Sequence, residues 1–167
     1  MALQMVIKME GVEGDSKSFY HKGWSEVLSW NWGMTSNRKS AQASDADKTS
    51  LNELSIIKPV GSDSPGIRLM FAQGKIIPSV EFNILPVVGK REAQSKYLHM
   101  MMEGVVIKSI VCGGSSEDNF FKEHITLLFD RVSFEFSRPT PAGANAGHEA
   151  EAWDFGWNVP SNSEWQH

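Results

Sequence analysis

The sequence predicts an all-β protein, a small β-barrel of two packed antiparallel sheets with one short α-helix. Three observations favour this fold class: stretches in which apolar and polar residues alternate, turns rich in Gly, Pro, Asp and Ser between them, and one stretch with helical periodicity. A chain of 167 residues fits one domain. We therefore expect residues 1–167 to form a single domain that ends in a polar tail at residues 159–167.

The N-terminal part contains two predicted strands. Apolar residues at every second position predict a strand over residues 3–9, ended by glycines. The next strand is expected over residues 24–35. There Trp24, Trp30 and Trp32 share one parity, so an extended chain places all three indoles on one face.

A long polar segment, residues 36–53, follows the tryptophans. Apart from alanines it contains one apolar residue, Leu51. Loops of this length in compact domains are uncommon and are either functional or disordered. The polar side chains that we select as candidate contacts with other copies of the chain are Asn37, Arg38, Lys39, Asp45, Asp47 and Lys48.

The segment after this loop predicts a strand over residues 55–60 and a helix over about residues 64–73. Ser64 is a favourable N-cap, and Pro65 suits the first helical position. Gly74 is a typical helix stop. The expected buried stripe of this helix consists of Ile67, Met70 and Phe71.

The C-terminal half predicts strands over residues 77–85, 97–112 and 123–138. Gly104 is a candidate bend in the second of these strands. In the third strand the apolar face changes parity at Asp130, which predicts a β-bulge or a sharp twist within about two residues of Asp130. The last predicted strand carries Trp153, Phe155 and Trp157. The residues expected in the core are Trp30, Trp32, Phe82, Phe129 and Phe134.

The composition argues against several classes of protein. A net charge of −4 argues against a nucleic-acid-binding protein, which usually presents a basic face. Cys112 is the one cysteine, so no internal disulfide is possible, and we expect it to be a buried small apolar residue. No apolar run is long enough to insert into a membrane. The N-terminus lacks the basic lead-in of a cleavable signal peptide, so we expect a cytoplasmic protein whose export would need another route.

The sequence offers no catalytic motif. No two of the five histidines stand at metal-ligand spacing, so we expect no metal and no cofactor. Glu149 and Glu151 share one face of the last predicted strand, and paired carboxylates on strands are typical of glycosidases, where two acids flank the scissile bond. A solvent-facing strand edge gives the same pattern. We therefore expect a protein that is not an enzyme, although a small β-jelly-roll hydrolase stays open as a third hypothesis.

Several segments together are similar to one known family. The stretch HKGWSEVLSWNWG, residues 21–33, resembles the signature of the Hcp family, the tube protein of bacterial type VI secretion systems. In that family too it follows a Gly-x-x-Gly turn, here within EGVEGDSK. Similar segments then come in the same order: LSIIKPVGSDSPGIRLMFAQGK, YLHMMMEGVVIKSIVCGG, ITLLFDRVSFEF and AWDFGWN. The similarity covers roughly residues 3–158, and the absence of glycine between residues 34 and 60 departs from it.

This resemblance implies a structural role. It implies a homo-hexameric ring whose copies stack into a tube, with spike protein, sheath proteins and effector cargo as partners. It also implies that the polar loop at residues 36–53 contacts a neighbouring subunit or the next ring, and that the protein is secreted after assembly. The alternative that the residues leave open is a carbohydrate-binding β-sandwich that uses exposed Trp24, Trp30 and Trp32.

Overall fold

The computed structural model describes residues 2–36, 40–41, 49–51, 53–88, 91–92, 97–137 and 152–166. In chain order the elements are β1 (Ala2–Met9), β2 (Ser25–Glu26), β3 (Ser29–Asn31), β4 (Met34–Ser36), β5 (Thr49–Leu51), β6 (Leu54–Pro59), α1 (Ser64–Ala72), β7 (Ile77–Val88), β8 (Arg91–Glu92), β9 (Leu98–Gly113), β10 (Lys122–Leu128), β11 (Arg131–Ser137), β12 (Ala152–Asn158) and β13 (Ser163–Glu164). Every strand pair is antiparallel, as the sequence predicts.

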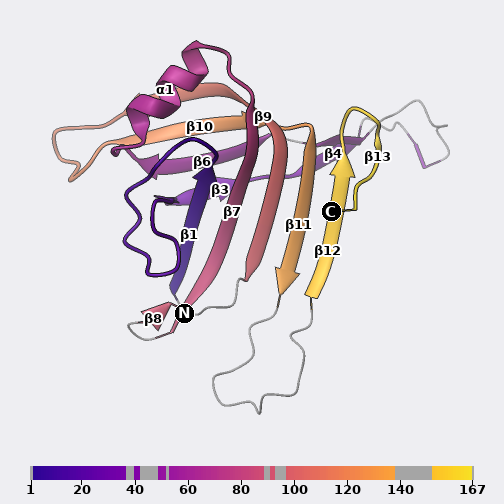
Figure 1. Ribbon diagram of the computed structural model, residues 1–167, viewed down its shortest axis with the longest axis horizontal. Coiled ribbons are helices and arrows are strands. Elements are labelled where there is room, and N and C mark those ends of the chain that lie inside the picture. The colour runs from indigo at the N-terminus through magenta and orange to yellow at the C-terminus, as the bar shows by residue number, and fades with distance from the viewer. Residues whose placement is uncertain are drawn as a thin grey trace.

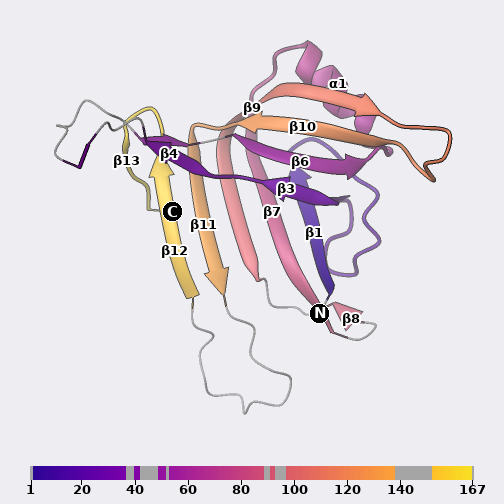
Figure 2. The ribbon, with the colours of Figure 1, turned by 180° about the vertical axis from the view of Figure 1, so that it is seen from behind.

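Two sheets pack face to face, and their strands cross (Figures 1 and 2). The first, sheet A, contains β2, β1, β8, β7, the first part of β9, β11, β12 and β13. The second, sheet B, contains the second part of β9, β10, β6 and β3. Among the described strands the path of pairing runs from β13 to β3 without closing into a barrel. The helix α1 lies at one end of the two sheets (Figure 1).

Strand β9 belongs to both sheets because it bends at Gly104. Residues 98–105 of this strand pair with β7, and residues 106–113 pair with β10. Gly104 has φ +62°, a left-handed conformation that glycine adopts without steric cost. The bend predicted at this glycine is therefore confirmed, and it carries the chain from sheet A into sheet B.

The regular ladder is absent at Asp130, as the prediction of a β-bulge or sharp twist requires, but the cause is a corner between two strands. The ladder is interrupted there, but β10 and β11 are two strands in two sheets. The corner between them is held to β9 by a hydrogen bond, in which the Asp130 amide donates to the Glu103 carbonyl at 3.1 Å. The Asp130 side chain also occupies the space beside Gly104, so a Cβ there would lie 2.6 Å from Oδ2. The prediction of one continuous strand over 123–138 was wrong because the apolar faces belong to different sheets.

The tryptophan segment also changes sheets. The strand predicted over residues 24–35 is three short strands, β2, β3 and β4. Its first part pairs with β1 and its middle part with β6. Between them the Val27 amide donates to the Met5 carbonyl, and the Leu28 amide donates to the Ile57 carbonyl. This crossing from sheet A to sheet B breaks the segment.

The helix differs from the prediction at its start and on one face. The N-cap is Asp63, and Ser64 is the first helical residue. The Ser64 hydroxyl accepts the Gly61 amide and donates to Glu123, so it does not cap the helix. In the expected stripe Ile67 and Met70 are buried, but Phe71 is 42% exposed. This nine-residue helix buries only a narrow stripe, and Phe71 lies beside it.

The core lies between the two sheets. Phe82 is fully buried in it. The other expected core residues, Trp30, Trp32, Phe129 and Phe134, are partly buried and pack against it.

The expected loop at residues 36–53 has a structured base. Strands β4 and β5 pair as a separate two-stranded sheet, with Met34 opposite Leu51. In both views this hairpin lies at the far end of the molecule from the β9–β10 turn (Figures 1 and 2). The six selected loop residues, Asn37, Arg38, Lys39, Asp45, Asp47 and Lys48, lie outside the described residues.

The expected polar tail is also partly structured. Strand β13 pairs with the end of β12. The Trp165 amide then donates to the Gly156 carbonyl, and the Arg131 guanidinium lies 5.6 Å from the centre of the Trp165 ring. The tail therefore folds back onto sheet A.

Candidate functional site

A buried ion network joins sheet B to the start of the helix. Lys58 in β6 is 2% exposed and stands opposite Glu123 of β10 in the ladder. Its ammonium nitrogen lies 2.7 Å from Glu123 Oε1 and 3.0 Å from Asp63 Oδ1. It also donates to the Pro59 carbonyl at 2.7 Å. An ammonium has three donors, so Lys58 is fully engaged.

Glu123 is held by groups from two elements besides β6. Its Oε1 accepts the Ser64 hydroxyl at 2.7 Å, and its Oε2 accepts Arg68 Nη1 at 2.8 Å. Burial alone would raise the pKa of this carboxyl. The hydrogen bonds from Lys58, Ser64 and Arg68 and the charge of Lys58 outweigh burial, so the pKa of Glu123 lies below its ordinary value. Glu123 is therefore a stable carboxylate and a poor candidate for a general acid at neutral pH.

The sequence analysis missed this network, although the alternation of residues along two strands places Lys58 and Glu123 on inward faces. Along β6 the buried side chains alternate, so Lys58 shares the inward face of Leu54 and Ile56. Glu123 likewise shares the inward face of Ile125 and Leu127 in β10. A lysine and a glutamate on the inward faces of two strands predict a buried pair once the strands are known to be neighbours.

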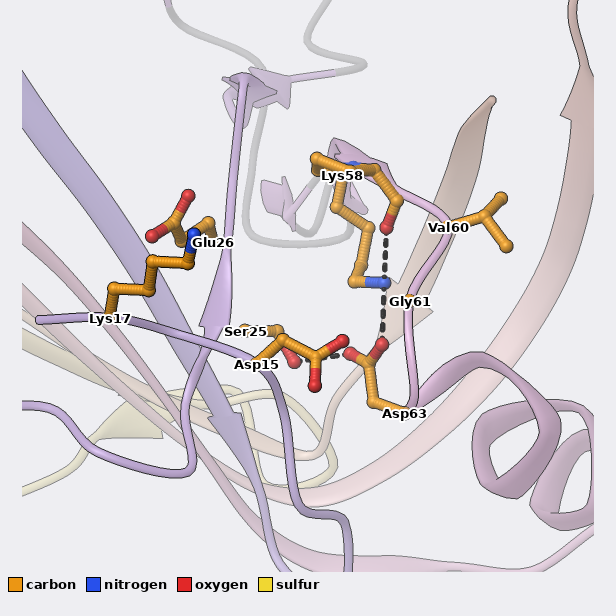
Figure 3. A pocket seen from close by; sticks show the side chains of 9 residues that line it. Asp15, Lys17, Ser25, Glu26, Lys58, Val60, Gly61 and Asp63 are labelled. Atoms are coloured by element: carbon orange, nitrogen blue, oxygen red, sulfur yellow. Dashed lines mark hydrogen bonds and ion pairs between the residues drawn. The ribbon is translucent and has the colours of Figure 1, made fainter. Parts of the chain in front are cut away.

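A pocket of about 260 Å³ opens beside this network (Figure 3). At its base the Ser25 hydroxyl donates to Asp63, which also contacts Lys58. Asp15 accepts the backbone amide of Ser62 at 2.7 Å and the hydroxyl of the same serine. These two hydrogen bonds lower the pKa of the Asp15 carboxyl. The pocket is lined by Asp15, Lys17, Ser25, Glu26, Lys58, Pro59, Val60, Gly61 and Asp63.

The contacts indicate a structural role for this site. The charged groups of Lys58, Asp63 and Glu123 all have partners within the network. Over the described ranges no three metal-ligating side chains converge. The network instead connects β2, β6, α1 and β10, and Asp15 adds the loop that precedes β2. Its chemistry fixes the relative positions of these elements.

The three tryptophans of the carbohydrate-binding alternative lie in different surroundings. Trp24 meets His21 edge to face, with ring centres 4.7 Å apart. Trp30 packs on Phe82, and Trp32 stacks on Phe134. All three indoles are partly buried, so they do not form the open sugar-binding face that this alternative requires.

The expected burial of Cys112 was wrong. Cys112 is exposed because it lies in the last residues of β9, where the β9–β10 hairpin extends beyond the core. The acidic pair Glu149 and Glu151 lies outside the described residues. Where the structure describes the chain, no helix has the length and apolar character needed to span a bilayer.

Comparison with known proteins identifies a family. The model of the family described as "Type VI secretion system effector, Hcp" matches residues 6–139. The curated protein Hcp1 of Pseudomonas aeruginosa is 29% identical over 164 residues, which cover 97% of this chain and 98% of that protein.

Solved structures agree on the fold. One, described as a type six secretion system protein, has a TM-score of 0.84 at 22% identity and covers 98% of this chain and 100% of its own. Hcp1 from Salmonella typhimurium has a TM-score of 0.75, also at 22% identity, and covers the same shares. At this level of identity these two structures show that the fold is shared.

Proposed function

Because the chain belongs to the Hcp family, the tube proteins of type VI secretion, we propose that its copies close into hexameric rings. The rings would stack into a tube that carries effectors and meets the spike and sheath proteins of the system. The family match over residues 6–139 is the observation that carries this proposal.

The surface of the described chain supports an assembling protein. Large apolar side chains are exposed on several elements, among them Leu3 on β1, Leu69 on α1 and Trp153 on β12. Strand edges at both ends of sheet A are also only partly covered. Uncovered edges lead to uncontrolled pairing unless another chain covers them, and a closed ring does so.

The polar loop would act between subunits or between rings. The β4–β5 hairpin carries its base away from the packed sheets (Figure 1). Exposed ion pairs are individually worth about 0–1 kcal/mol, so loop contacts would hold rings together while leaving them separable. Deleting residues 38–48 and joining the ends with a short Gly-Ser turn should preserve folding and weaken stacking. Tubes that keep the native salt dependence after this deletion would exclude the loop from assembly.

Electron microscopy of the purified protein tests the proposed function itself. Rings with an open centre are expected, together with stacks of rings at high concentration. Single 18.6 kDa particles at every concentration would contradict the proposal.

A further inference from the structure

A loop at residues 10–24 connects β1 to β2 and folds back on itself. The amide of Ser16 donates to the carbonyl of Trp24 at 2.8 Å, which joins the two arms of the loop. Between these arms Phe19 and Tyr20 are 77% and 49% exposed, and their rings meet edge to face. The loop therefore presents an aromatic pair to its surroundings.

The imidazole of His21 holds this loop to sheet A. The side chain is 7% exposed. Its Nδ1 lies 3.3 Å from the hydroxyl of Ser18 in the same loop, and its Nε2 lies 3.4 Å from Asn83 Nδ2 of β7. Asn83 is fully buried and lies on the face of β7 opposite to that of the core residues Phe82 and Ile84. The loop therefore covers the face of the sheet that points away from the core.

The orientation of the Asn83 amide is fixed by its other neighbours. Its Nδ2 lies 3.3 Å from Glu81 Oε1, and because an ionised carboxylate only accepts hydrogen bonds, the amino group points this way. Its Oδ1 accepts a hydrogen bond from His99 Nδ1 at 2.6 Å. Turning the amide over would place its oxygen against the carboxylate of Glu81. The amide therefore donates toward His21.

This orientation determines the protonation state of His21 while the loop is closed. A ring nitrogen that faces an amino group must accept, so Nε2 carries no proton, and Nδ1 carries the proton that it donates to Ser18. A second proton on the ring would place Nε2–H against the amino group of Asn83. His99 differs, because its Nδ1 donates to Asn83 in either protonation state. Protonation therefore removes the contact of His21 with the amide and leaves that of His99 intact.

The charged groups of the neighbouring elements do not offset this loss. On β1, Lys8 donates to two carbonyls of the loop and pairs with Glu13 of the loop at 2.9 Å. On β7 and β9, Glu81 Oε1 lies 3.4 Å from His99 Nδ1. Each carboxylate therefore already has a partner, and the ammonium of Lys8 lies beside the loop. A nearby charge of the same sign disfavours a charged His21.

We propose that His21 is an acid-sensitive latch: protonation of its imidazole breaks the contact with Asn83 and releases residues 16–24 from sheet A, together with the exposed pair Phe19 and Tyr20. An exposed histidine takes up a proton near about pH 6.5. Because opening is linked to the uptake of one proton, the open fraction should rise about tenfold for each pH unit below that value. The latch belongs to a single folded subunit and does not depend on the proposed ring.

Hydrogen–deuterium exchange of the full-length chain, followed by mass spectrometry, tests the latch. The amides of Ser16 and Trp24 report on the loop, because both donate hydrogen bonds within it. Their protection, corrected for the intrinsic exchange rate at each pH, should fall about tenfold from about pH 6.5 to about pH 5.5. In this range the Glu123 carboxylate of the ion network keeps its charge. Equal protection of the loop at the two pH values would overturn the proposal.

Two histidine variants assign the effect to one side chain. His21→Gln removes the titrating group, so protection of its loop should be the same at both pH values, whether or not the loop is looser. The matched control is His124→Gln, which removes an exposed histidine of β10 and should keep the tenfold change. A pH-dependent loop in the His21→Gln chain, or loss of the change in the His124→Gln chain, would assign the effect to another group and overturn the latch.

Asn83→Asp should reverse the sign of the effect. A carboxylate in place of the amide accepts a hydrogen bond from the protonated Nε2 of His21, so the loop should be better protected at about pH 5.5 than at about pH 6.5. Circular dichroism at both pH values verifies the fold of each variant. If Asn83→Asp does not fold, the comparison of His21→Gln with His124→Gln decides. A folded Asn83→Asp chain whose loop loosens in acid as the wild type does would contradict the assigned contact.

Discussion

The two ends of sheet A are held together by different physical means. Near β2 and the helix, the network around Lys58 joins several elements through buried charges. Near β12, aromatic rings pack on one another. The ring centres of Tyr97 and Phe136 are 5.4 Å apart, and those of Phe136 and Trp153 are 5.8 Å apart. Removing one partner from a buried ion network leaves an unpaired buried charge and costs much stability. Removing one partly exposed ring from a stack costs less, because no charge is left unpaired. The first end therefore depends on every partner of the network, whereas the second leaves Trp153 half exposed.

Removing the charge of Glu123 should have the largest effect on stability. Glu123→Gln leaves the buried ammonium of Lys58 with one carboxylate partner fewer, and breaking a buried pair in this way costs about 3–5 kcal/mol. Urea unfolding followed by fluorescence measures the loss. The matched control is Glu53→Gln, which breaks the exposed pair with Lys108 and should cost about 0–1 kcal/mol. Equal losses of unfolding free energy in the two variants would show that the buried network stabilises the fold no more than an exposed ion pair does.

Low pH should reduce the stability that the charged groups near β2 and the helix contribute. The pKa values of Glu123 and Asp15 are lowered in the folded protein, so the unfolded chain binds protons first as the pH falls. Their contribution to stability is fully present above the ordinary pKa of a carboxyl and is lost as the pH falls toward the folded pKa. Urea midpoints should therefore be steady near neutral pH and fall below about pH 4.5. Glu123→Gln should flatten this fall, and a variant with the wild-type slope would contradict the assignment.

The bend in β9 should be sensitive to a single methyl group. Gly104→Ala places a side chain in a left-handed conformation, which costs about 1–2 kcal/mol, and it also forces the Asp130 carboxylate to move. Thermal unfolding measures the effect. Combining Gly104→Ala with Asp130→Ala should restore the stability lost through the contact with the Asp130 side chain. The loss that comes from the left-handed backbone conformation should remain. An unchanged melting curve for Gly104→Ala would contradict the described bend.

The aromatic end should show the smallest loss within one chain. Trp153→Ala removes a half-exposed ring from its stack on Phe136, and such pairs contribute about 0.5–1.5 kcal/mol. Its unfolding free energy should therefore change far less than that of Glu123→Gln. A loss as large as that of the buried network would mean that Trp153 is a core residue and would remove the contrast between the two ends.

The sequence predicted the elements well where one strand keeps one apolar face. The strand at residues 3–9, the single helix and the bend at Gly104 follow from local periodicity and from glycine's conformational freedom. The errors occur where the chain changes sheets, at Asp130 and between Glu26 and Ser29. There the chain faces the same core from two different sheets in turn, and periodicity alone does not distinguish a sheet change from a bulge.

The site was harder to predict than the fold. The inward parity of Lys58 and Glu123 is visible in the sequence, but their pairing depends on β6 and β10 being neighbours, which joins residues far apart in the chain. The tryptophans drew attention as a possible sugar-binding face, but indoles that pack on Phe82 and Phe134 serve the interior.

The mass of the particle in solution tests the central claim most directly. Light scattering across a wide range of protein concentrations should give a single species with the mass of a hexamer, and the mass should be independent of concentration above the point at which rings form. A mass of 18.6 kDa throughout that range would contradict the account.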